Sequence, residues 1–173
     1  LLKKTVADIR RRAAEAGRDP RSILIFNLQT VIVGETDLAA QAKWQEYKSY
    51  VSYEGALALI SGWTGIDFGQ YQPDQVLKHL HTNAIQSAVE TFSTADPTRQ
   101  WTVQGLADWV GIGGFGPLLV GSAETVADEL QSWVEETDVD GFNLAYAVTH
   151  ETFTDVVELL VPELQASLQR FPK

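Results

Sequence analysis

The sequence predicts an α/β protein with parallel strands, and two observations carry this prediction. First, residues 23–33 form a β-branched run with few polar residues, which is typical of a strand buried on both faces of a parallel sheet, and residues 139–148 are expected to form a second buried strand. Second, the segments around these runs repeat apolar residues at helical spacing and begin at residues that cap helices. Helices and strands therefore alternate along the chain.

The first half of the chain is expected to place helices before and after the first strand. Apolar residues share one helical face between Thr5 and Ala16, and Gly17 follows as a helix end. After the strand, the segment Gly34 to Asp37 supplies an N-cap for a helix that continues to about residue 51. A further short helix is expected around residues 54–60.

The second half is expected to contain three capped helices. Thr102 precedes a helix that ends near residue 110, Ser122 caps a helix that ends near Glu136, and Thr152 caps the last helix. Pro162 is expected to kink or restart that last helix. Two strands alone do not form an independently stable parallel sheet. Either further strands lie in the middle of this chain or the missing strands belong to a segment outside it, and we expect the second.

The composition excludes several classes of function. The 173 residues carry 13 Lys and Arg against 23 Asp and Glu, so phosphate neutralisation does not drive nucleic-acid binding. No apolar run approaches the roughly 18 residues that a membrane span needs. Cys is absent, which fits a reducing, cytoplasmic location, and His79 and His81 have no third metal ligand nearby in the sequence. One acidic group is interpreted as the solvated end of a helix: Glu135, Glu136, Asp138 and Asp140.

Several blocks of the sequence resemble one known family. The chain is similar to the C-terminal part of the nitrilotriacetate monooxygenase component A family, which belongs to the bacterial-luciferase-like flavin monooxygenases together with alkane and desulfurisation monooxygenases. The similar blocks lie in the same order as in the family, at residues 16–20 (AGRDP), 33–36 (VGET), 65–67 (GID), 112–130 (IGGFGPLLVGSAETVADEL), 140–144 (DGFNL) and 161–165 (VPELQ).

This resemblance implies a fold. Residues 1–173 would form a single C-terminal portion of a TIM (β/α)8 barrel, with parallel strands and a helical insertion. Strand seven would lie at about residues 23–33, the insertion at about 52–100, and strand eight at about 139–148.

The resemblance also implies an activity. Family members are two-component monooxygenases that use reduced FMN from a separate flavin reductase, together with O2, to oxygenate a small organic substrate. The family's catalytic residues lie upstream of the matched part, so none is assigned here, and the chain alone is expected to be inactive. The choice between FMN and a deazaflavin stays open from these residues, although the family favours FMN.

Candidate site residues fall into two groups. Gly121 and Ser122 begin a helix on the carboxyl face of the expected barrel, where free N–H groups could hold a flavin phosphate or a substrate carboxylate, although Ser122 could be only an N-cap. Asn143 lies in the second strand and could point toward the flavin. Aromatic residues in or beside the insertion are candidates for a substrate pocket or lid, or for a local core: Trp63, Phe68, Tyr71, Trp101 and Phe115.

Other functions stay open. An incomplete barrel exposes strand flanks and apolar faces, so we expect either a missing N-terminal barrel half as a partner or self-association. A non-catalytic half-barrel that serves oligomerisation is the main alternative to an enzyme. A complete small α/β protein that binds an apolar ligand near Trp63 and Trp101 is a third.

Overall fold

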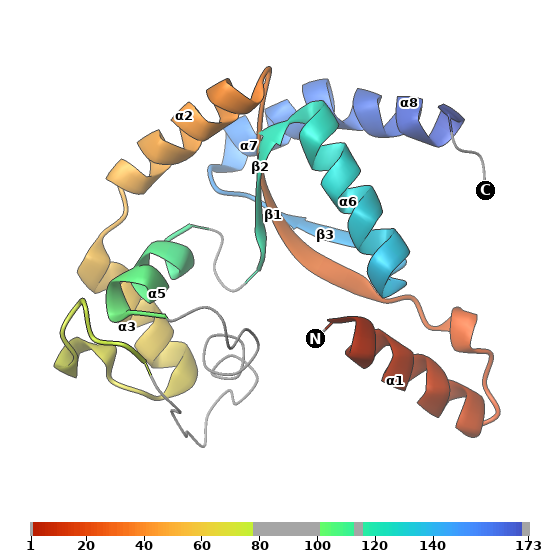
Figure 1. The fold of residues 1–173 in the computed structure, drawn as a ribbon, viewed down its shortest axis with the longest axis horizontal. Helices are drawn as coiled ribbons and strands as arrows, with labels where there is room; N and C mark the ends of the chain where they lie inside the picture. The colour runs from red at the N-terminus through yellow and green to blue at the C-terminus, as the bar shows by residue number, and fades with distance from the viewer. Residues whose placement is uncertain (1, 78–100, 113–115, 171–173) are drawn as a thin grey trace. The chain divides into compact units, whose positions relative to one another are not determined.

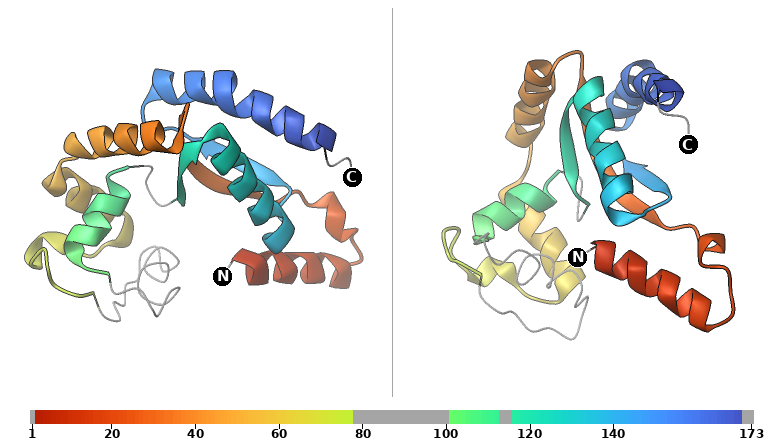
Figure 2. Two further views of the ribbon diagram at one scale, coloured as in Figure 1. Left: turned by 45° about the horizontal axis from the view of Figure 1, so that its top comes forward. Right: turned by 45° about the vertical axis from the view of Figure 1, so that its right-hand side comes forward.

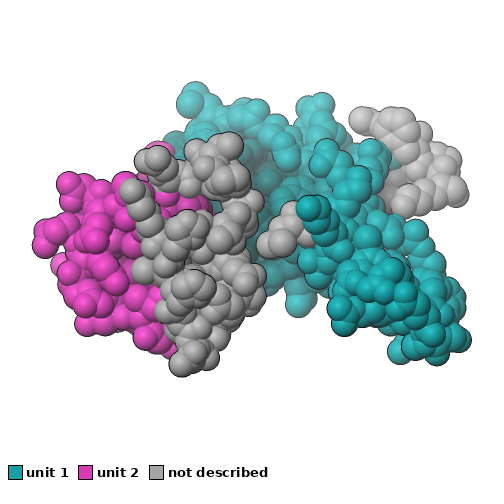
Figure 3. Space-filling view, turned by 60° about the horizontal axis from the view of Figure 1, so that its bottom comes forward, with its two compact units in different colours: residues 1–44, 116–173 teal, residues 45–115 magenta. Residues whose placement is uncertain are grey.

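The computed structural model describes residues 2–77, 101–112 and 116–170, and the chain divides into two compact units (Figures 1 and 3). Unit 1 comprises residues 1–44 and 116–173, and unit 2 comprises residues 45–115. The insertion predicted at residues 52–100 lies within the range of unit 2. Along the chain the elements are α1 (Leu2–Glu15), η1 (Pro20–Ser22), β1 (Phe26–Gly34), α2 (Asp37–Ser49), α3 (Tyr53–Thr64), η2 (Phe68–Gln70), α5 (Val103–Val110), β2 (Leu118–Ser122), α6 (Ala123–Thr137), β3 (Gly141–Ala145), α7 (Thr149–Asp155), η3 (Val156–Leu160) and α8 (Val161–Arg170).

Unit 1 is built on a three-stranded parallel sheet in which β1 is the central strand (Figure 1). The carboxyl half of β1, residues 30–34, pairs with β2, and its amino half, residues 26–30, pairs with β3. Neighbouring residues of paired strands project from the same face, so this register decides which side chains share a face.

The sheet confirms the parallel α/β class and corrects several boundaries. The first strand begins at Phe26, three residues later than predicted, and the second predicted strand is shortened to Gly141–Ala145. The strand Leu118–Ser122 was not predicted. This five-residue segment, which contains Gly121, becomes a strand because β1, in a distant part of the chain, offers it backbone hydrogen-bond partners. The TIM barrel itself stays a prediction.

Helices cover one face of the sheet (Figures 1 and 2). Val31 and Val33 of β1 project toward α6 and the turn η3, where they join a buried apolar cluster. The other buried members of this cluster are Val126, Ala127, Leu130, Val156 and Leu160. Leu119 of β2 and Phe142 and Leu144 of β3 pack against it, as the register requires.

The opposite face of the sheet exposes large apolar side chains at its amino half, and we call Phe26, Leu28 and Asn143 on this side the open face. Phe26 is 56% exposed and Leu28 is 45% exposed. Asn143 of β3 pairs in register with Leu28 and is also exposed. Toward the carboxyl end of the same face, Thr30 and Ile32 are buried. An exposed apolar sheet face of this kind marks a surface that another element normally covers.

One arginine fastens the amino ends of β1 and β3. Arg10 of α1 donates to the carbonyl oxygens of Pro20 (2.7 Å) and Ile23 (2.5 Å) and forms an ion pair with Asp140 (2.8 Å). Asp140 also accepts the backbone N–H of Ile25 at 2.7 Å, and its own N–H donates to the Ile25 carbonyl oxygen at 2.8 Å. The side chain of Arg10 is thereby almost fully buried.

The acidic group near β3 is therefore not simply solvated. Asp138 pairs with Arg21 at 2.7 Å and with Arg10 at 3.4 Å. Asp138 also ends α6 in the left-handed conformation, at φ 64°, where its N–H donates to the carbonyl oxygen of Val134. Asp138 and Asp140 are exposed, as a solvated helix end predicts, but both are also ion-paired. Nothing in the sequence indicated these pairs, because the basic partners lie more than a hundred residues earlier in the chain.

The predicted helix starts are mostly confirmed. Ser122 accepts the N–H of Thr125 at the start of α6, and Thr102 accepts the N–H of Gly105 at the start of α5. The last helix begins at Thr149 rather than at Thr152, whose hydroxyl accepts the N–H of Val148 before the helix.

The last helix also continues through Pro162. It contains the π-helical turn η3, in which the N–H of Val161 donates to the carbonyl oxygen of Val156. Proline lacks an N–H and crowds the preceding turn, so an extra residue at this point relieves the clash.

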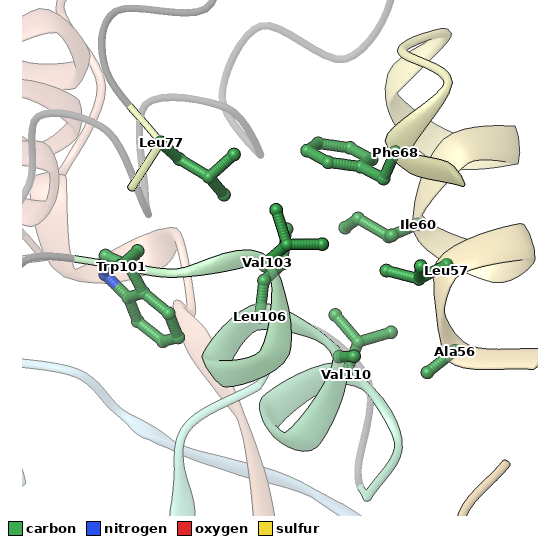
Figure 4. Close-up of a cluster of buried hydrophobic side chains, with 10 residues drawn as sticks. Ala56, Leu57, Ile60, Phe68, Leu77, Trp101, Val103, Leu106 and Val110 are labelled. Carbon is green, nitrogen blue, oxygen red and sulfur yellow. The ribbon is translucent and has the colours of Figure 1, made fainter. Parts of the chain in front are cut away.

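Unit 2 has its own apolar core between α3 and α5 (Figure 4). Ile60 of α3 and Phe68 of η2 are fully buried, as are Val103 and Leu106 of α5. Leu77 closes the core through a backbone hydrogen bond from its N–H to the carbonyl oxygen of Trp101. Among residues 2–77, 101–112 and 116–170, no helix is both long and apolar enough to cross a membrane.

Candidate functional site

The carboxyl ends of β1 and β2 form the first candidate region. Gly34 and Ser122 are paired in register, and each strand leads into a helix at this end. The backbone approaches closely here, because a Cβ on Gly34 would lie 2.6 Å from the backbone nitrogen of Ala40. In parallel α/β folds, ligand sites are built from loops and helix starts at this edge of the sheet.

The side chain of Asp37 contacts the segment that contains the predicted cofactor residues Gly121 and Ser122. Its Oδ1 accepts the backbone N–H of Ser122 at 2.7 Å. This hydrogen bond, aided by the hydroxyl of Thr125, holds the pKa of Asp37 below its ordinary value. The carboxylate is therefore ionised at neutral pH and lies against the start of α6.

Lys43 forms a second charged contact at this end of unit 1. Its Nζ donates to Asp155 at 2.5 Å and to the carbonyl oxygen of Val33 at 3.2 Å, and it lies 3.4 Å from Glu151. Burial by itself lowers the pKa of Lys43, but the hydrogen bond and charge of Asp155 together with Glu151 outweigh it and raise that pKa. This group ties α2 to α7 and to the end of β1.

Asn143 occupies a different position from the Gly121–Ser122 corner. It lies in the middle of β3 on the open face, beside Leu28, with its amide exposed. Beyond the end of β3, the ring of Tyr146 packs against Phe153 of α7 with centroids 5.7 Å apart. The structure therefore does not bring Asn143 into the hydrogen-bonded group at Asp37, Ser122 and Thr125.

Four of the predicted substrate-pocket aromatics lie in described parts of unit 2. Phe68 is fully buried in the core, and Trp101 is 6% exposed and packs against Trp109 with ring centroids 5.5 Å apart. Trp63 and Tyr71 are half-buried at the edge of the same core. This placement matches the alternative of a local core for Phe68 and Trp101 and leaves Trp63 and Tyr71 as the more accessible pair.

Some predicted residues lie outside the described residues. These are Phe115, His79 and His81. Among residues 2–77, 101–112 and 116–170, no group of three or more His, Cys, Asp or Glu side chains is arranged to hold a metal ion.

Sequence reasoning missed the charged groups at both ends of the sheet. Asp37 was interpreted only as part of an N-cap segment, whereas Thr36 caps α2 by accepting the N–H of Ala39 at 3.1 Å. An acidic residue in the first turn of a helix is a signal that could have drawn attention to Asp37. Nothing local in the sequence indicates that Lys43 pairs with Asp155 or that Arg10 pairs with Asp140. These partners lie 112 and 130 residues further along the chain.

The fold and the strand ends define a parallel α/β protein whose candidate residues lie at the carboxyl edge and on one open face of its sheet. Comparison with known proteins identifies the class. Residues 1–141 match the luciferase-like monooxygenase family, so the chain belongs to that family. Members of this family are flavin-dependent enzymes.

Named relatives agree with this assignment. The chain is 48% identical over 163 residues to dimethyl-sulfide monooxygenase of Hyphomicrobium sulfonivorans, covering 94% of this chain and 34% of the relative. It is 38% identical to long-chain alkane monooxygenase of Geobacillus thermodenitrificans, covering 95% and 33%. It is 28% identical to nitrilotriacetate monooxygenase component A of Aminobacter aminovorans, covering 92% and 36%. The chain thus spans about a third of the length of these relatives.

Solved structures give the same picture. The crystal structure of DmoA from Hyphomicrobium sulfonivorans superposes with a TM-score of 0.81 at 47% identity, covering 96% of this chain and 35% of that one. The crystal structure of riboflavin lyase RcaE with modified FMN and riboflavin superposes with a TM-score of 0.80 at 30% identity, covering 96% and 36%. The resemblance found in the sequence to bacterial-luciferase-like monooxygenases is confirmed.

Proposed function

We propose that this chain forms the C-terminal part of a two-component monooxygenase that uses reduced FMN and O2 to oxygenate a small organic substrate containing sulfur or nitrogen. The observation that carries the proposal is 48% identity over almost the whole chain to a dimethyl-sulfide monooxygenase. A separate flavin reductase supplies the reduced FMN in this proposal, and the enzyme is cytoplasmic. When bound, reduced FMN provides the electrons with which dioxygen is activated.

The chain's main contribution in this proposal is structural. The side chains that project from barrel strands away from the helices fill the barrel interior. Phe26 and Leu28 project from that face and are 56% and 45% exposed in this chain. We therefore propose that an N-terminal barrel half, corresponding to the two thirds of the relatives that this chain does not match, packs on the open face.

Two groups of residues are proposed to face the bound molecules. Asn143 has an exposed amide on the open face and can both donate and accept hydrogen bonds, so it fits a contact with a flavin ring system. Within unit 2, the half-buried Trp63 and Tyr71 supply apolar surface that suits contact with an apolar part of the substrate. We do not place the flavin phosphate at Gly121 and Ser122, because Asp37 already accepts the N–H of Ser122 there.

The open face also favours a second function. An exposed apolar sheet face next to two edge strands suits self-association, and a half-barrel that only assembles would need no flavin. Flavin binding by a completed barrel separates the two functions.

The test uses a chimera in which this chain replaces the matching 163-residue segment of dimethyl-sulfide monooxygenase. The proposal predicts that the chimera binds FMN, measured by quenching of flavin fluorescence, and that the isolated chain does not bind it. A folded chimera without flavin affinity would contradict the proposal and favour the assembly function. Replacing the segment with the same chain carrying Asn143→Ala tests the proposed flavin contact, which predicts weaker binding with an unchanged fold.

A further inference from the structure

Two helix N-termini lie side by side where β1 and β2 end. Gly34 and Ser122 are neighbours in the sheet, α2 begins at Asp37, and α6 begins immediately after Ser122. A helix N-terminus carries partial positive charge and attracts an anion. The question is which anion this pair of helix ends accommodates.

The space beside Gly121 is occupied by the protein itself. A Cβ on Gly121 would lie 2.8 Å from Cγ2 of Thr125 and 3.0 Å from Oδ1 of Asp37. Glycine at the start of a helix often allows a ligand phosphate to approach the backbone. Here the absence of a side chain makes room for the carboxylate of Asp37 and for Thr125.

Two of the N–H groups at this corner are also engaged. The N–H of Ser122 donates to Oδ1 of Asp37 at 2.7 Å, and the N–H of Thr125 donates to the hydroxyl oxygen of Ser122 at 3.2 Å. The hydrogen bond from Ser122 holds the pKa of Asp37 below its ordinary range, so the acceptor is a carboxylate at neutral pH. A phosphate that approached the Ser122 N–H would meet the negative charge of Asp37 in place of a free donor.

We propose that Asp37 is the resident anion of the α6 N-terminus, and that it positions the Gly121–Ser122 corner and excludes phosphate from it. Asp37 lies at the start of α2, which follows β1, and Ser122 lies at the start of α6, which follows β2. Their hydrogen bond therefore joins the starts of the two helices. The proposal does not rest on the proposed function. If the chain is part of a flavin enzyme, the proposal requires that other residues hold the flavin phosphate.

The test follows backbone amide signals of the isotopically labelled chain by NMR during titration with inorganic phosphate. In the unmodified chain, the amides of Ser122 to Thr125 should show no saturable shift. Asp37→Ala vacates the acceptor, and phosphate affinity at these amides should rise by roughly tenfold, the scale of one charge at a helix terminus. Saturable phosphate binding at Ser122 in the unmodified chain, as tight as in Asp37→Ala, would overturn the proposal.

Glu124→Ala is the matched control, because it removes one exposed negative charge from the same helix turn without vacating the Ser122 N–H. It should leave the phosphate response close to that of the unmodified chain. An equal gain of affinity in Glu124→Ala and Asp37→Ala would show an effect of net charge alone and overturn the proposal.

Asp37→Asn keeps an oxygen acceptor but removes the charge, so it covers the case in which Asp37→Ala does not fold. In the unmodified chain the Ser122 amide signal should shift as Asp37 is protonated, with a midpoint below the ordinary range of an Asp pKa. In Asp37→Asn that pH-dependent step should be absent. A Ser122 signal that titrates identically in both proteins would also overturn the proposal.

Discussion

Replacing Phe26 and Leu28 together by Ser tests whether the open face is an interior surface of a completed barrel. Burying a Phe or Leu side chain fully stabilises a protein by about 1.5–3 kcal/mol. Phe26 is 56% exposed and Leu28 is 45% exposed in this chain, so the stabilisation still to be gained by covering both is about 1.5–3 kcal/mol. The double substitution should therefore destabilise the chimera by that amount more than it destabilises the isolated chain.

The assay is urea unfolding of the chimera and of the isolated chain, each at a concentration where light scattering gives a monomer. Ile32→Ala is the matched control, because Ile32 projects from the same face but is already 2% exposed. Ile32→Ala should lower the free energy of unfolding by about 2–5 kcal/mol, and by the same amount in the chimera and in the isolated chain. An equal loss of stability from the Phe26 and Leu28 substitutions in both proteins would refute the assignment of this face.

Three further predictions follow from the ion pairs and the unit 2 core. The pKa of Asp140 is lowered, chiefly by the N–H of Ile25 and then by Arg10. The stabilisation of the fold by this carboxylate is therefore fully present above the unfolded Asp pKa of about 4 and is lost as the pH falls through the lower folded value. Urea midpoints should therefore show Asp140→Asn to be less stable than the unmodified chain at pH 7, with the difference vanishing in acid; a constant difference would contradict this. The pKa of Lys43 is raised, so the stabilisation by this lysine is fully present below the unfolded Lys pKa of about 10.4 and is lost as the pH rises through the folded value. Urea midpoints over an alkaline pH series should therefore show Lys43→Met to be destabilised up to about pH 10.4 and no longer destabilised above the folded pKa; a constant difference would contradict this. Phe68→Ala should destabilise unit 2 by about 3–5 kcal/mol, monitored by tryptophan fluorescence during unfolding, and a change well below 1 kcal/mol would argue against a core role.

The sequence was sufficient for elements whose signal is local. The runs that became β1 and β3 are recognisable because few polar residues interrupt them, although one face of both strands is exposed at Phe26, Leu28 and Asn143 rather than buried as predicted. Ser122 was recognisable as a cap because its hydroxyl acts on a backbone N–H only three residues away. These features depend on neighbours that the sequence places within one helical turn or one strand.

Features that depend on distant partners could not be predicted. The strand β2 exists because Leu118 to Ser122 pair with residues 30–34 of β1, and a five-residue run carries too little local signal to reveal this. The contact between Asp37 and Ser122 joins residues 85 positions apart. The role of Asp140 likewise depends on Arg10, 130 positions earlier. Tertiary contacts of this range leave no periodicity in the sequence.

The candidate site shows the same division. The position of Gly121 and Ser122 at a helix start was predicted, but the carboxylate that occupies the corner was not. The aromatic cluster was recognised from composition, whereas the burial of Phe68 and Trp101 required the packing of α3 against α5. Which aromatics could reach a substrate therefore depended on a tertiary contact.

Oxygen transfer by the chimera is the most direct test of the central proposal. The chimera is supplied with dimethyl sulfide, FMN, a flavin reductase together with a reduced nicotinamide as its electron donor, and isotopically labelled dioxygen, and the product is examined by mass spectrometry. The account predicts labelled oxygen in the product only when this chain completes the barrel and reduced FMN is present. A folded, flavin-binding chimera that transfers no labelled oxygen would contradict the assignment of this chain to a working monooxygenase.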